Sequence, residues 1–236
     1  MTSSAPQNLL DLLHPGAGVL IPGAANALAA RIIESAGFPI VYLTGAGVAN
    51  SYLGAPDMGL TTVTEMAAHV AAVRDAVQLP LIADGDTGFG NPLNQVRTDA
   101  RAVEGFDAAL DRMAAYKEAG ADLMFVEAPT SRQELQRITQ AVPGRHIANV
   151  VYGGKTPMLP REDFAALGFA GVLYANAGLQ AAMLAMKRTM MHLQTAGSLA
   201  GAEDSILGVD ERQKFVDPAR WLAIEQRDAA TGFATE

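Results

Sequence analysis

The sequence predicts an α/β protein of the TIM-like (β/α) barrel type, shortened to about six βα units, with a helical appendage at its C-terminal end. Three observations lead to this prediction. Ala-rich helical stretches alternate with short apolar runs, a Gly or Pro separates most helices from the run that follows, and each run ends in small or polar residues. Continuous apolar runs are typical of parallel strands covered on both faces, and glycine commonly ends a helix.

The expected strands follow one another at helix-length intervals. The first is GVLIPGA at residues 18–24. The later strands each follow a helical pattern, in ARIIESAGFPIVYLTG, AAVRDAVQLPLIADGD, AAYKEAGADLMFVEAP, ITQAVPGRHIANVVYG and FAALGFAGVLYANAG. At roughly 30 residues per unit, residues 17–196 hold about six units, fewer than the eight of a complete barrel.

Small and polar residues collect at the C-terminal ends of these strands. In parallel α/β folds such ends meet on one face, where binding sites are built, and this favours a barrel. The ends are Pro22-Gly23-Ala24, Thr44-Gly45-Ala46, Asp84-Gly85-Asp86, Glu127-Ala128-Pro129, Asn149 with Tyr152-Gly153-Gly154, and Asn176.

The barrel is expected to occupy residues 1–196. Residues 197–236 lose the strand pattern, carry more charge and contain one plausible helix at Pro218–Arg227. An appendage of this kind usually packs on the body of the protein or on a neighbouring subunit, and both alternatives stay open.

Composition excludes several classes of function. The 236 residues, 50% of them hydrophobic and 18% charged, are enough to bury one large core. The formal charge of −8 and the pI near 5.0 would repel nucleic acid and an anionic membrane alike. The N-terminus has no signal-peptide pattern, and no apolar run reaches the ~18 residues of a membrane span. A cytoplasmic protein is therefore expected.

The chain has no cysteine, which excludes disulfides and thiolate catalysis. Its histidines, at positions 14, 69, 146 and 192, are far apart in the sequence and show no zinc-ligand spacing. Any metal ion should therefore be bound through oxygen.

Two aspartates form the strongest candidate metal site. Asp84 and Asp86 directly follow an apolar run and alternate with glycine, and such oxygen ligands suit Mg²⁺, with Mn²⁺ as an alternative. The plainer interpretation is that one aspartate caps the turn that follows. Glu127, at another strand end, adds a third carboxylate, and three carboxylates at one mouth need a cation or a proton to coexist.

Arg97 supplies the complementary charge. A guanidinium binds a carboxylate with two hydrogen bonds, so an Arg beside a magnesium site indicates a carboxylate substrate. A surface pair of Arg97 with Asp99 or Glu104 explains the pattern equally well. The backbone amides of Thr44, Gly45 and Ala46 are candidates to bind the same anion.

Two further residues have weaker patterns. Asn149 and the glycine turn after it are candidates to bind polar substrate atoms, and a purely structural turn is nearly as good an explanation. Asp57 lies in the loop Gly54–Gly59 and is either a gating or metal-water contact or, as is more usual for an isolated loop Asp, a solvated side chain.

Five stretches carry a resemblance to a known family: YLTGAGVANSYLGAPDMG, IADGDTGFGNPLN, RTDARAVEG, EAGADLMFVEA and NVVYGGKTP. They resemble, in the same order, motifs of the isocitrate lyase / phosphoenolpyruvate mutase superfamily, particularly its 2-methylisocitrate lyase, dimethylmalate lyase and oxaloacetate decarboxylase branches. The resemblance runs from Gly18 to about Met190. It implies an α/β barrel, a magnesium ion and cleavage of a C–C bond, or in other members P–C chemistry, through an enolate-like oxyacid.

The resemblance also implies a role for each candidate residue. Thr44, Gly45 and Ala46 match the turn that cradles the substrate, and Asn149 matches the Asn before the glycine turn. Asp84 and Asp86 match the metal-site acids, and Asp57 the acid of a gating loop. Arg97 matches the substrate-binding Arg of the RTDA motif, and Glu127 the acid of a PEA-like motif.

The chain departs from the family pattern before Arg97. In the family, a helix, a strand with an HxED-type motif, a loop with a KKCGH motif and a second helix separate DxDTGxGN from the strand that ends in RTDA. Here Asn94-Gln95-Val96 leads directly into Arg97. About two βα units are therefore missing, and with them a metal-site Glu and the Cys that donates a proton in those lyases.

Together these features predict a Mg²⁺-dependent carbon–carbon lyase that acts on a small 2-oxo or 2-hydroxy di- or tricarboxylate through an enolate. Without the lyase Cys, decarboxylation of oxaloacetate or a related 2-oxo acid is favoured, because water can deliver the final proton. The alternatives are phosphonopyruvate/phosphoenolpyruvate mutase-type P–C chemistry, a catalytically impaired metabolite-binding homologue, and an internal deletion that folds poorly or exchanges elements between subunits.

The expected partners are a small carboxylate substrate and further copies of the chain, in a dimer or tetramer. Neither nucleic acid nor a membrane is an expected partner.

Overall fold

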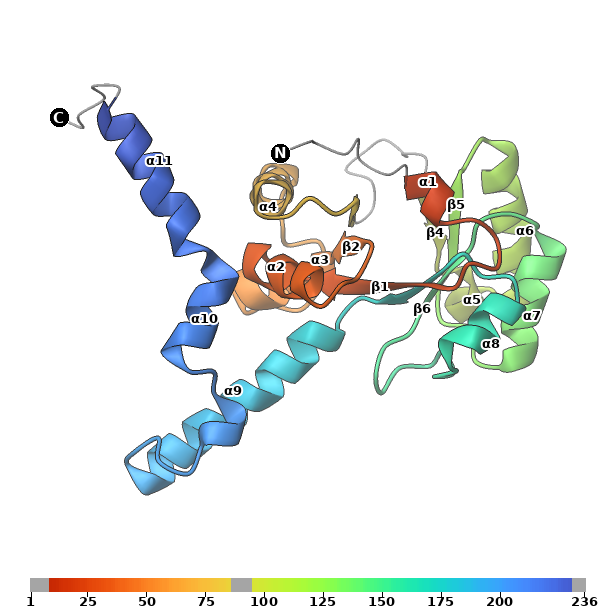
Figure 1. Ribbon diagram of the computed structural model, residues 1–236. Coiled ribbons are helices and arrows are strands. Elements are labelled where there is room, and N and C mark those ends of the chain that lie inside the picture. Colours follow the sequence, from red (N-terminus) through yellow and green to blue (C-terminus); the bar gives the residue numbers. More distant parts are fainter. Residues whose placement is uncertain (1–8, 86–94, 231–236) are drawn as a thin grey trace. The chain divides into compact units, whose positions relative to one another are not determined.

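The structure, a computed structural model, describes residues 9–85 and 95–230 (Figure 1). The chain divides into two compact units, Met1–Gln180 and Ala181–Glu236. Helix α9 (Ala177–Ala196) begins in the first unit and continues into the second. The domain boundary expected after residue 196 stays a prediction.

Among the described residues, the first unit contains seven strands, arranged in a five-stranded and a two-stranded sheet. They are β1 (Val19–Ala24), β2 (Val41–Leu43), β3 (Leu81–Ala83), β4 (Gln95–Thr98), β5 (Leu123–Val126), β6 (Ile147–Asn149) and β7 (Gly171–Tyr174). Parallel ladders join them in the orders β3-β2-β1-β7-β6 and β4-β5. A parallel bridge between Met124 and His146 places β5 beside β6. Apart from β3 and β4, strands that are neighbours in sequence are thus neighbours in space, and β1 lies beside β7, as in a (β/α) barrel.

The barrel is open between β3 and β4. These strands are the two ends of the order, and in the described part of the chain no ladder joins them. The shortened α/β barrel predicted from the sequence is therefore present. It has one strand more than the six counted from apolar runs, because β4 has the sequence Gln-Val-Arg-Thr and contains no such run.

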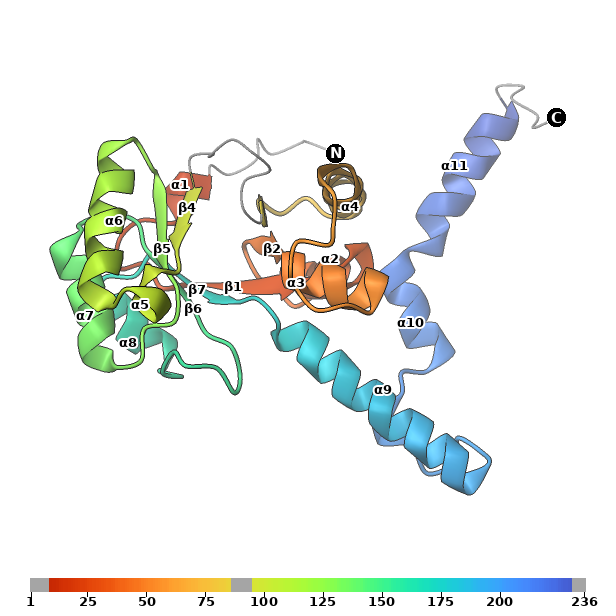
Figure 2. The ribbon, with the colours of Figure 1, turned by 180° about the vertical axis from the view of Figure 1, so that it is seen from behind.

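Helices cover the outer face of the strands (Figures 1 and 2). The first three strands are covered by α2 (Ala27–Ser35) and α4 (Val63–Ala76), and the others by α5 (Ala100–Val103), α6 (Phe106–Glu118), α7 (Arg132–Ala141) and α8 (Arg161–Ala166). Local sequence fixes where several of them begin. Thr62 and Glu65 form a capping box at α4, and the side chains of Asn26 and Ser131 cap α2 and α7.

A cluster of inward-facing apolar side chains fills the space between the strands. It includes Ile21, Tyr42, Ile82, Leu123, Ile147 and Leu173, which come from six of the seven strands. The short helix α1 (Leu9–Leu12) and the fully buried Leu13 pack against the same cluster. Buried apolar surface therefore connects the strands on both sides of the open seam.

The second unit is helical in the part that the structure describes. After α9 come a short 3₁₀ turn (Glu203–Ser205), α10 (Val209–Val216) and α11 (Pro218–Ala230). The helix predicted at Pro218–Arg227 is α11. Of the described residues in this unit only Thr189 and Ala202 are buried. Across both units, no described helix has both the length and the apolar character that a membrane span requires.

Candidate active site

The candidate site residues meet at the C-terminal ends of the strands of the first unit. Thr44 follows β2, Asp84 follows β3, and Arg97 lies on β4. Glu127 follows β5, and Asn149 is the last residue of β6. Parallel strands present these ends on the same face, so the sheet brings together residues that are far apart in the sequence.

Asp84 is held by two groups of the neighbouring strand β2 and the turn after it. Its Oδ2 accepts a hydrogen bond of 3.1 Å from the backbone amide of Gly45. Tyr42, of β2, also forms a side-chain hydrogen bond with Asp84. Burial of Tyr42, followed by the charge of Asp84 and this hydrogen bond, raises the pKa of the phenol far above its usual value. Tyr42 therefore stays protonated and donates to the carboxylate.

The turn after β2 begins a short helix, α3 (Gly45–Val48), which continues into a π-helical turn at Ala49–Leu53. Thr44 is the N-cap, and its Oγ1 accepts from the Gly47 amide at 3.2 Å and donates to Oδ1 of Asn176 at 3.4 Å. Of the amides at this helix start, only that of Ala46 has no protein partner among the described residues. The turn therefore offers a substrate one amide, since the Gly45 amide binds Asp84.

Arg97 points toward carboxylates that directly follow its own strand and the adjacent one. Its Nη2 is 2.7 Å from Oδ1 of Asp99, and its Nε is 3.6 Å from Oε2 of Glu127. The guanidinium also lies over the ring of Phe125, 5.6 Å from the ring centroid. Burial opposes its charge, yet the carboxylates around it, including Asp84 across the site, raise its pKa. The side chain is 51% exposed, so it remains accessible to a ligand.

The Arg97–Asp99 surface pair foreseen as the plainer interpretation is thus present, together with the contact to Glu127. The predicted pair of Arg97 with Glu104 is not: Glu104 pairs instead with Arg112.

Glu127 is fixed by its backbone. Its amide donates to the carbonyl of Thr98 at 3.0 Å, which extends the β4–β5 ladder by one bond. The next residue, Ala128, has φ of 53°, a left-handed conformation that is rare for residues with a Cβ. Backbone strain of this kind tends to occur at functional sites. The left-handed conformation of Ala128 turns the chain sharply after Glu127. The side chain of Glu127 is 24% exposed.

Two buried oxygen atoms at the C-terminal ends of β5 and β6 accept no hydrogen bond from the described residues. They are Oε2 of Glu127 and Oδ1 of Asn149. Such atoms are rare in native proteins because an unmet acceptor is costly. They indicate that a ligand, an ion with its waters, or a proton belongs at the site.

The donor set fits a hard cation such as Mg²⁺. The polar groups are carboxylate, amide and hydroxyl oxygens, and Mg²⁺ binds through one or two carboxylates while it keeps several waters. Asp84 would hold the ion. Its predicted partner Asp86 lies outside the described residues, and within them no cluster of three or more His, Asp or Glu side chains is close enough to hold a metal.

Asp57 lies in an exposed loop between the π-helical turn and α4. Its charge is the smallest of the influences on the raised pKa of Tyr42, which follows first from burial and the charge of Asp84.

The sequence alone did not identify Tyr42 or Asn176 as site residues. Tyr42 lies inside an apolar run, where a Tyr is taken for core, and Asn176 was noted only as a strand end. Alternation along β2 would have placed Tyr42 on the same face as Thr44, and this is the signal that was available.

Comparison with known proteins identifies the family. The family model described as phosphoenolpyruvate phosphomutase matches residues 9–105 and 95–194. Residues 95–105, which include Arg97, fall within both matched ranges.

Individual relatives agree. The chain is 34% identical to the 2,3-dimethylmalate lyase of Eubacterium barkeri, over 85% of this chain and 90% of that one. It is 30% identical to the 2-methylisocitrate lyase of Bacillus subtilis (strain 168), over 88% and 87%. The first alignment spans 260 positions, more than the 236 residues of this chain, so the relative has residues without a counterpart here.

Solved structures share the fold. Oxaloacetate acetylhydrolase in complex with the product oxalate superimposes with a TM-score of 0.83 at 24% identity, covering 95% of this chain and 97% of that one. Phosphonopyruvate hydrolase with oxalate and Mg²⁺ gives 0.77 at 23% identity, covering 93% and 97%. With the family model matched across most of the chain, the protein belongs to the phosphoenolpyruvate phosphomutase family, within the PEP mutase/isocitrate lyase superfamily.

Proposed function

We propose that this protein is a Mg²⁺-dependent carbon–carbon lyase that decarboxylates oxaloacetate or a closely related 2-oxo acid. Its relatives named as 2,3-dimethylmalate and 2-methylisocitrate lyases support the general class, a lyase that acts on carbon–carbon bonds. The single observation that carries the proposal is the position of Arg97, a cation 3.6 Å from Glu127 and close enough to Asp84 for their charges to interact. A dianionic oxo acid fits between a metal carboxylate and such a cation.

Each residue has a task in this proposal. Arg97 binds a substrate carboxylate with its exposed donors, and the Ala46 amide adds a further hydrogen bond. Tyr42 and the Gly45 amide keep Asp84 in one orientation, which sets the position of the ion that it binds. When bound, Mg²⁺ would withdraw electron density from the oxygen on C2 of the substrate.

Decarboxylation needs few groups beyond these. The C3–C4 bond breaks, CO₂ leaves, and the electron pair moves into the enolate of pyruvate. Arg97 and the polar atoms of the mouth stabilise the negative charge. A proton must then be added at C3.

The test is an assay of oxaloacetate consumption with and without Mg²⁺, corrected for the buffer reaction, with pyruvate measured by lactate dehydrogenase. We expect a metal-dependent rate that EDTA abolishes. The same assay with 2-methylisocitrate and 2,3-dimethylmalate as substrates covers the cleavage reactions named for the relatives. A rate on either of them and none on oxaloacetate would contradict the proposed substrate.

The family description favours a second candidate, phosphonopyruvate or phosphoenolpyruvate chemistry. Phosphonopyruvate turnover followed by phosphorus NMR separates the two. A third outcome, a homologue that binds without catalysis, would appear as calorimetric binding of oxalate in the presence of Mg²⁺ together with no turnover of any of these substrates.

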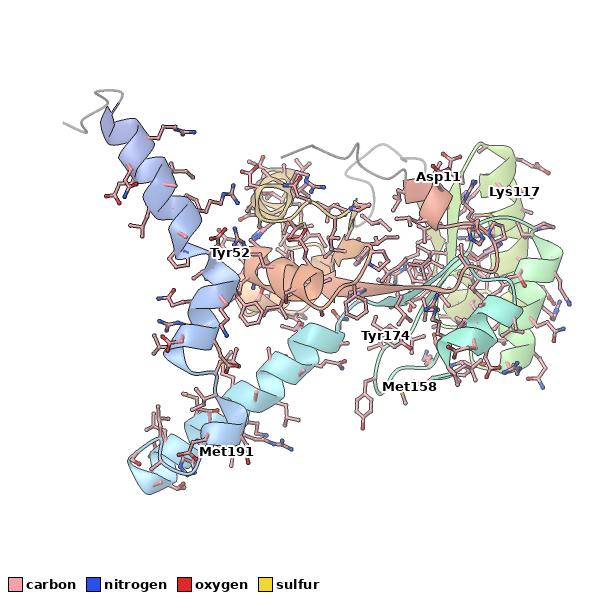
Figure 3. All side chains as sticks on the ribbon, in the orientation of Figure 1. Asp11, Tyr52, Lys117, Met158, Tyr174 and Met191 are labelled. Atoms are coloured by element: carbon pink, nitrogen blue, oxygen red, sulfur yellow. The ribbon has the colours of Figure 1, made fainter. Side chains whose placement is uncertain are left out.

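We further propose that the protein is a cytoplasmic homo-oligomer, a dimer or tetramer. Support comes from the apolar side chains exposed along α9, which include Met183 (56%), Met186 (63%) and Met190 (53%); Met191, labelled in Figure 3, is 60% exposed. Monomers rarely expose so many large apolar side chains on one helix. Light scattering on the purified protein tests the state, and Met186→Glu is expected to lower the measured mass.

A further inference from the structure

One ion pair of the first unit is more enclosed than the others. Arg101 lies on α5 and Glu134 in the first turn of α7, and their side chains are only 19% and 20% exposed. Each of the other ion pairs in the described part of the chain has a partner that is about half exposed. Nε of Arg101 is 2.9 Å from Oε2 of Glu134, and Nη2 is 3.0 Å from Oε1. Two parallel hydrogen bonds of this kind fix the orientation of both side chains.

The same carboxylate holds the loop that follows Glu127. Oε2 of Glu134 accepts a hydrogen bond of 2.6 Å from the backbone amide of Thr130, whose hydroxyl accepts from Arg101. The amide of Glu134 in turn donates to Oγ of Ser131, the N-cap of α7, at 3.1 Å. Burial opposes the charge of Glu134, but the hydrogen bonds from Arg101 and Thr130 hold its pKa below the usual value. The carboxylate therefore stays ionised at neutral pH, and the contacts stay in place.

The strained turn at Ala128 lies between two fixed points. Before it, the amide of Glu127 donates to the carbonyl of Thr98 at 3.0 Å. After it, Glu134 holds the amide of Thr130. A left-handed conformation such as that of Ala128, with φ of 53°, persists only where the surrounding structure enforces it. The hold on Thr130 is therefore one of the two contacts that keep this turn, and with it the direction of the Glu127 side chain.

Arg101 fastens that turn to the strand that carries Arg97. It follows Arg97 by four residues, at the start of the helix after β4. A chain of contacts thus runs from Glu127 along its loop to Glu134 and across to Arg101. It returns along β4 to Arg97, whose Nε is 3.6 Å from Oε2 of Glu127.

We propose that Arg101 and Glu134 are positioning residues of the active site: their ion pair holds the turn after Glu127 and so keeps the Glu127 carboxyl group beside the Arg97 guanidinium. The inference rests on the proposed function, in which Arg97 binds a substrate carboxylate. The orientation of Arg97 toward that carboxylate then depends on the ion pair. In a purely structural role, by contrast, the pair would fasten α5 to α7 without affecting the site.

Glu134→Ala removes the hold on Thr130 and on Arg101 together. A misplacement of about 1 Å at a reacting site can cost on the order of 100-fold, so we expect kcat/KM for oxaloacetate to fall by about tenfold or more. The dissociation constant of oxalate, measured by calorimetry with Mg²⁺, should rise as well. Glu134→Gln keeps an oxygen that can accept from the Thr130 amide, so it should recover part of both losses.

The matched control is Arg132→Gln. Arg132 forms two contacts with the carboxylate of Asp163, each of 3.1 Å, and so joins α7 to α8 through a pair of similar geometry. This pair holds no residue of the loop between Glu127 and Ser131. Arg132→Gln should therefore keep the wild-type kcat/KM and the wild-type affinity for oxalate.

Ala128→Gly separates positioning from stability. Because the pair acts through the left-handed turn, Glu134→Ala should lower kcat/KM no further in the Ala128→Gly protein, although it should lower the melting temperature in both backgrounds. Two results would overturn the proposal. One is a lower melting temperature of Glu134→Ala with unchanged kcat/KM and oxalate affinity, and the other is a double mutant whose kinetic losses simply add.

Arg101→Lys gives the answer if Glu134→Ala does not fold. It keeps the charge but cannot form both hydrogen bonds, so a partial loss of kcat/KM is expected, and wild-type kinetics would contradict the positioning role. If wild type releases no CO₂ above the buffer reaction but binds oxalate, and Glu134→Ala weakens that binding, the decarboxylase function is refuted and the positioning role is supported. Wild-type protein that neither turns over nor binds oxalate would refute both.

Discussion

The backbone amide of Gly45 donates a 3.1 Å hydrogen bond to Oδ2 of Asp84, across the gap between two adjacent strand ends. A Cβ at position 45 would lie 3.1 Å from the same oxygen and 3.2 Å from the carboxyl carbon, closer than side chains normally approach. Glycine at this position thus allows Asp84, the proposed metal ligand, to sit directly against the turn after β2.

Gly45→Ala should therefore displace Asp84 by a few tenths of an ångström and weaken metal binding. Loss of an orienting contact typically costs about 10–100-fold in metal affinity, so we expect the Mg²⁺ concentration for half-maximal activity to rise by about tenfold, with little change in melting temperature. Gly208→Ala is the control, since its Cβ would meet open space. An unchanged Mg²⁺ requirement in Gly45→Ala would contradict the assignment of Asp84 to the metal.

Arg97→Gln removes the cation that is proposed to bind the substrate carboxylate. A hydrogen bond to a charged group is worth about 1.5–3 kcal/mol, so kcat/KM should fall by roughly 10–150-fold. Arg97→Lys should recover only part of this, because an ammonium cannot form the paired hydrogen bonds of a guanidinium. Arg112→Gln breaks an exposed ion pair with Glu104 and should leave kcat/KM unchanged. Steady-state kinetics on the four proteins decides.

Ala128→Gly relieves the left-handed strain that follows Glu127. The strain costs roughly 1–2 kcal/mol and the added freedom of glycine about 0.5–1 kcal/mol, so stability should rise slightly or stay level. Activity should fall several-fold, because Glu127 loses its fixed orientation. Ala119→Gly, at a residue with φ of −74°, should only destabilise. Urea unfolding beside kcat measures both effects; a drop in stability equal to that of Ala119→Gly would argue against strain at Ala128.

His146 makes stability depend on pH. Burial lowers its pKa below the usual value of about 6.5, and the nearby Lys117 acts in the same direction, against a hydrogen bond with the Val142 carbonyl. The unfolded chain therefore binds a proton at a higher pH than the folded one. Stability should be complete above pH 6.5 and decline as the pH falls below it, until the lowered folded pKa is reached.

The free energy at stake is roughly 1.4 kcal/mol for each unit by which the pKa is lowered. Melting temperatures at pH 7.5 and 5.5 test this, with His146→Gln expected to flatten the dependence and the exposed His14→Gln expected to leave it unchanged. An equally steep decline in His146→Gln would assign the effect to other groups.

Much of the fold was predictable because six of its strands are continuous apolar runs that end in small or polar residues. The same logic placed Thr44, Asp84, Glu127 and Asn149 at strand ends, and the structure brings these ends to one face. β4 could not be predicted from its residues, because Val96 is the only apolar residue in it. The strand is defined instead by its pairing with β5. Sequence also gave no sign of the left-handed Ala128, because Ala is common in every ordinary conformation.

Arg97 shows why the contacts of a side chain do not follow from its neighbours in the sequence. Its surroundings in sequence fit an exposed pair with Asp99 and a catalytic role equally well, and it forms the Asp99 pair and the Glu127 contact at once. Only the three-dimensional neighbours of a flexible side chain decide between such alternatives. Asp86, the second metal-site candidate, lies outside the described residues and stays a prediction.

Because the barrel is open between β3 and β4 in the described residues, the β1–β7 ladder joins the two halves of the candidate site. Of the candidate site, Tyr42, Thr44 and Asp84 lie on the β1–β3 side of that ladder, whereas Arg97, Glu127 and Asn149 lie on the β4–β7 side. In the described part of the chain the two sides are joined by this ladder, by the inward-facing cluster and by hydrogen bonds such as that from Thr44 Oγ1 to Asn176 Oδ1. The candidate site is therefore divided between two halves of the barrel that share one central ladder. In the proposed complex, a dianion bound both to an ion on Asp84 and to Arg97 would link the two sides, so that the substrate itself would supply some of the stiffness that a closing strand gives a complete barrel.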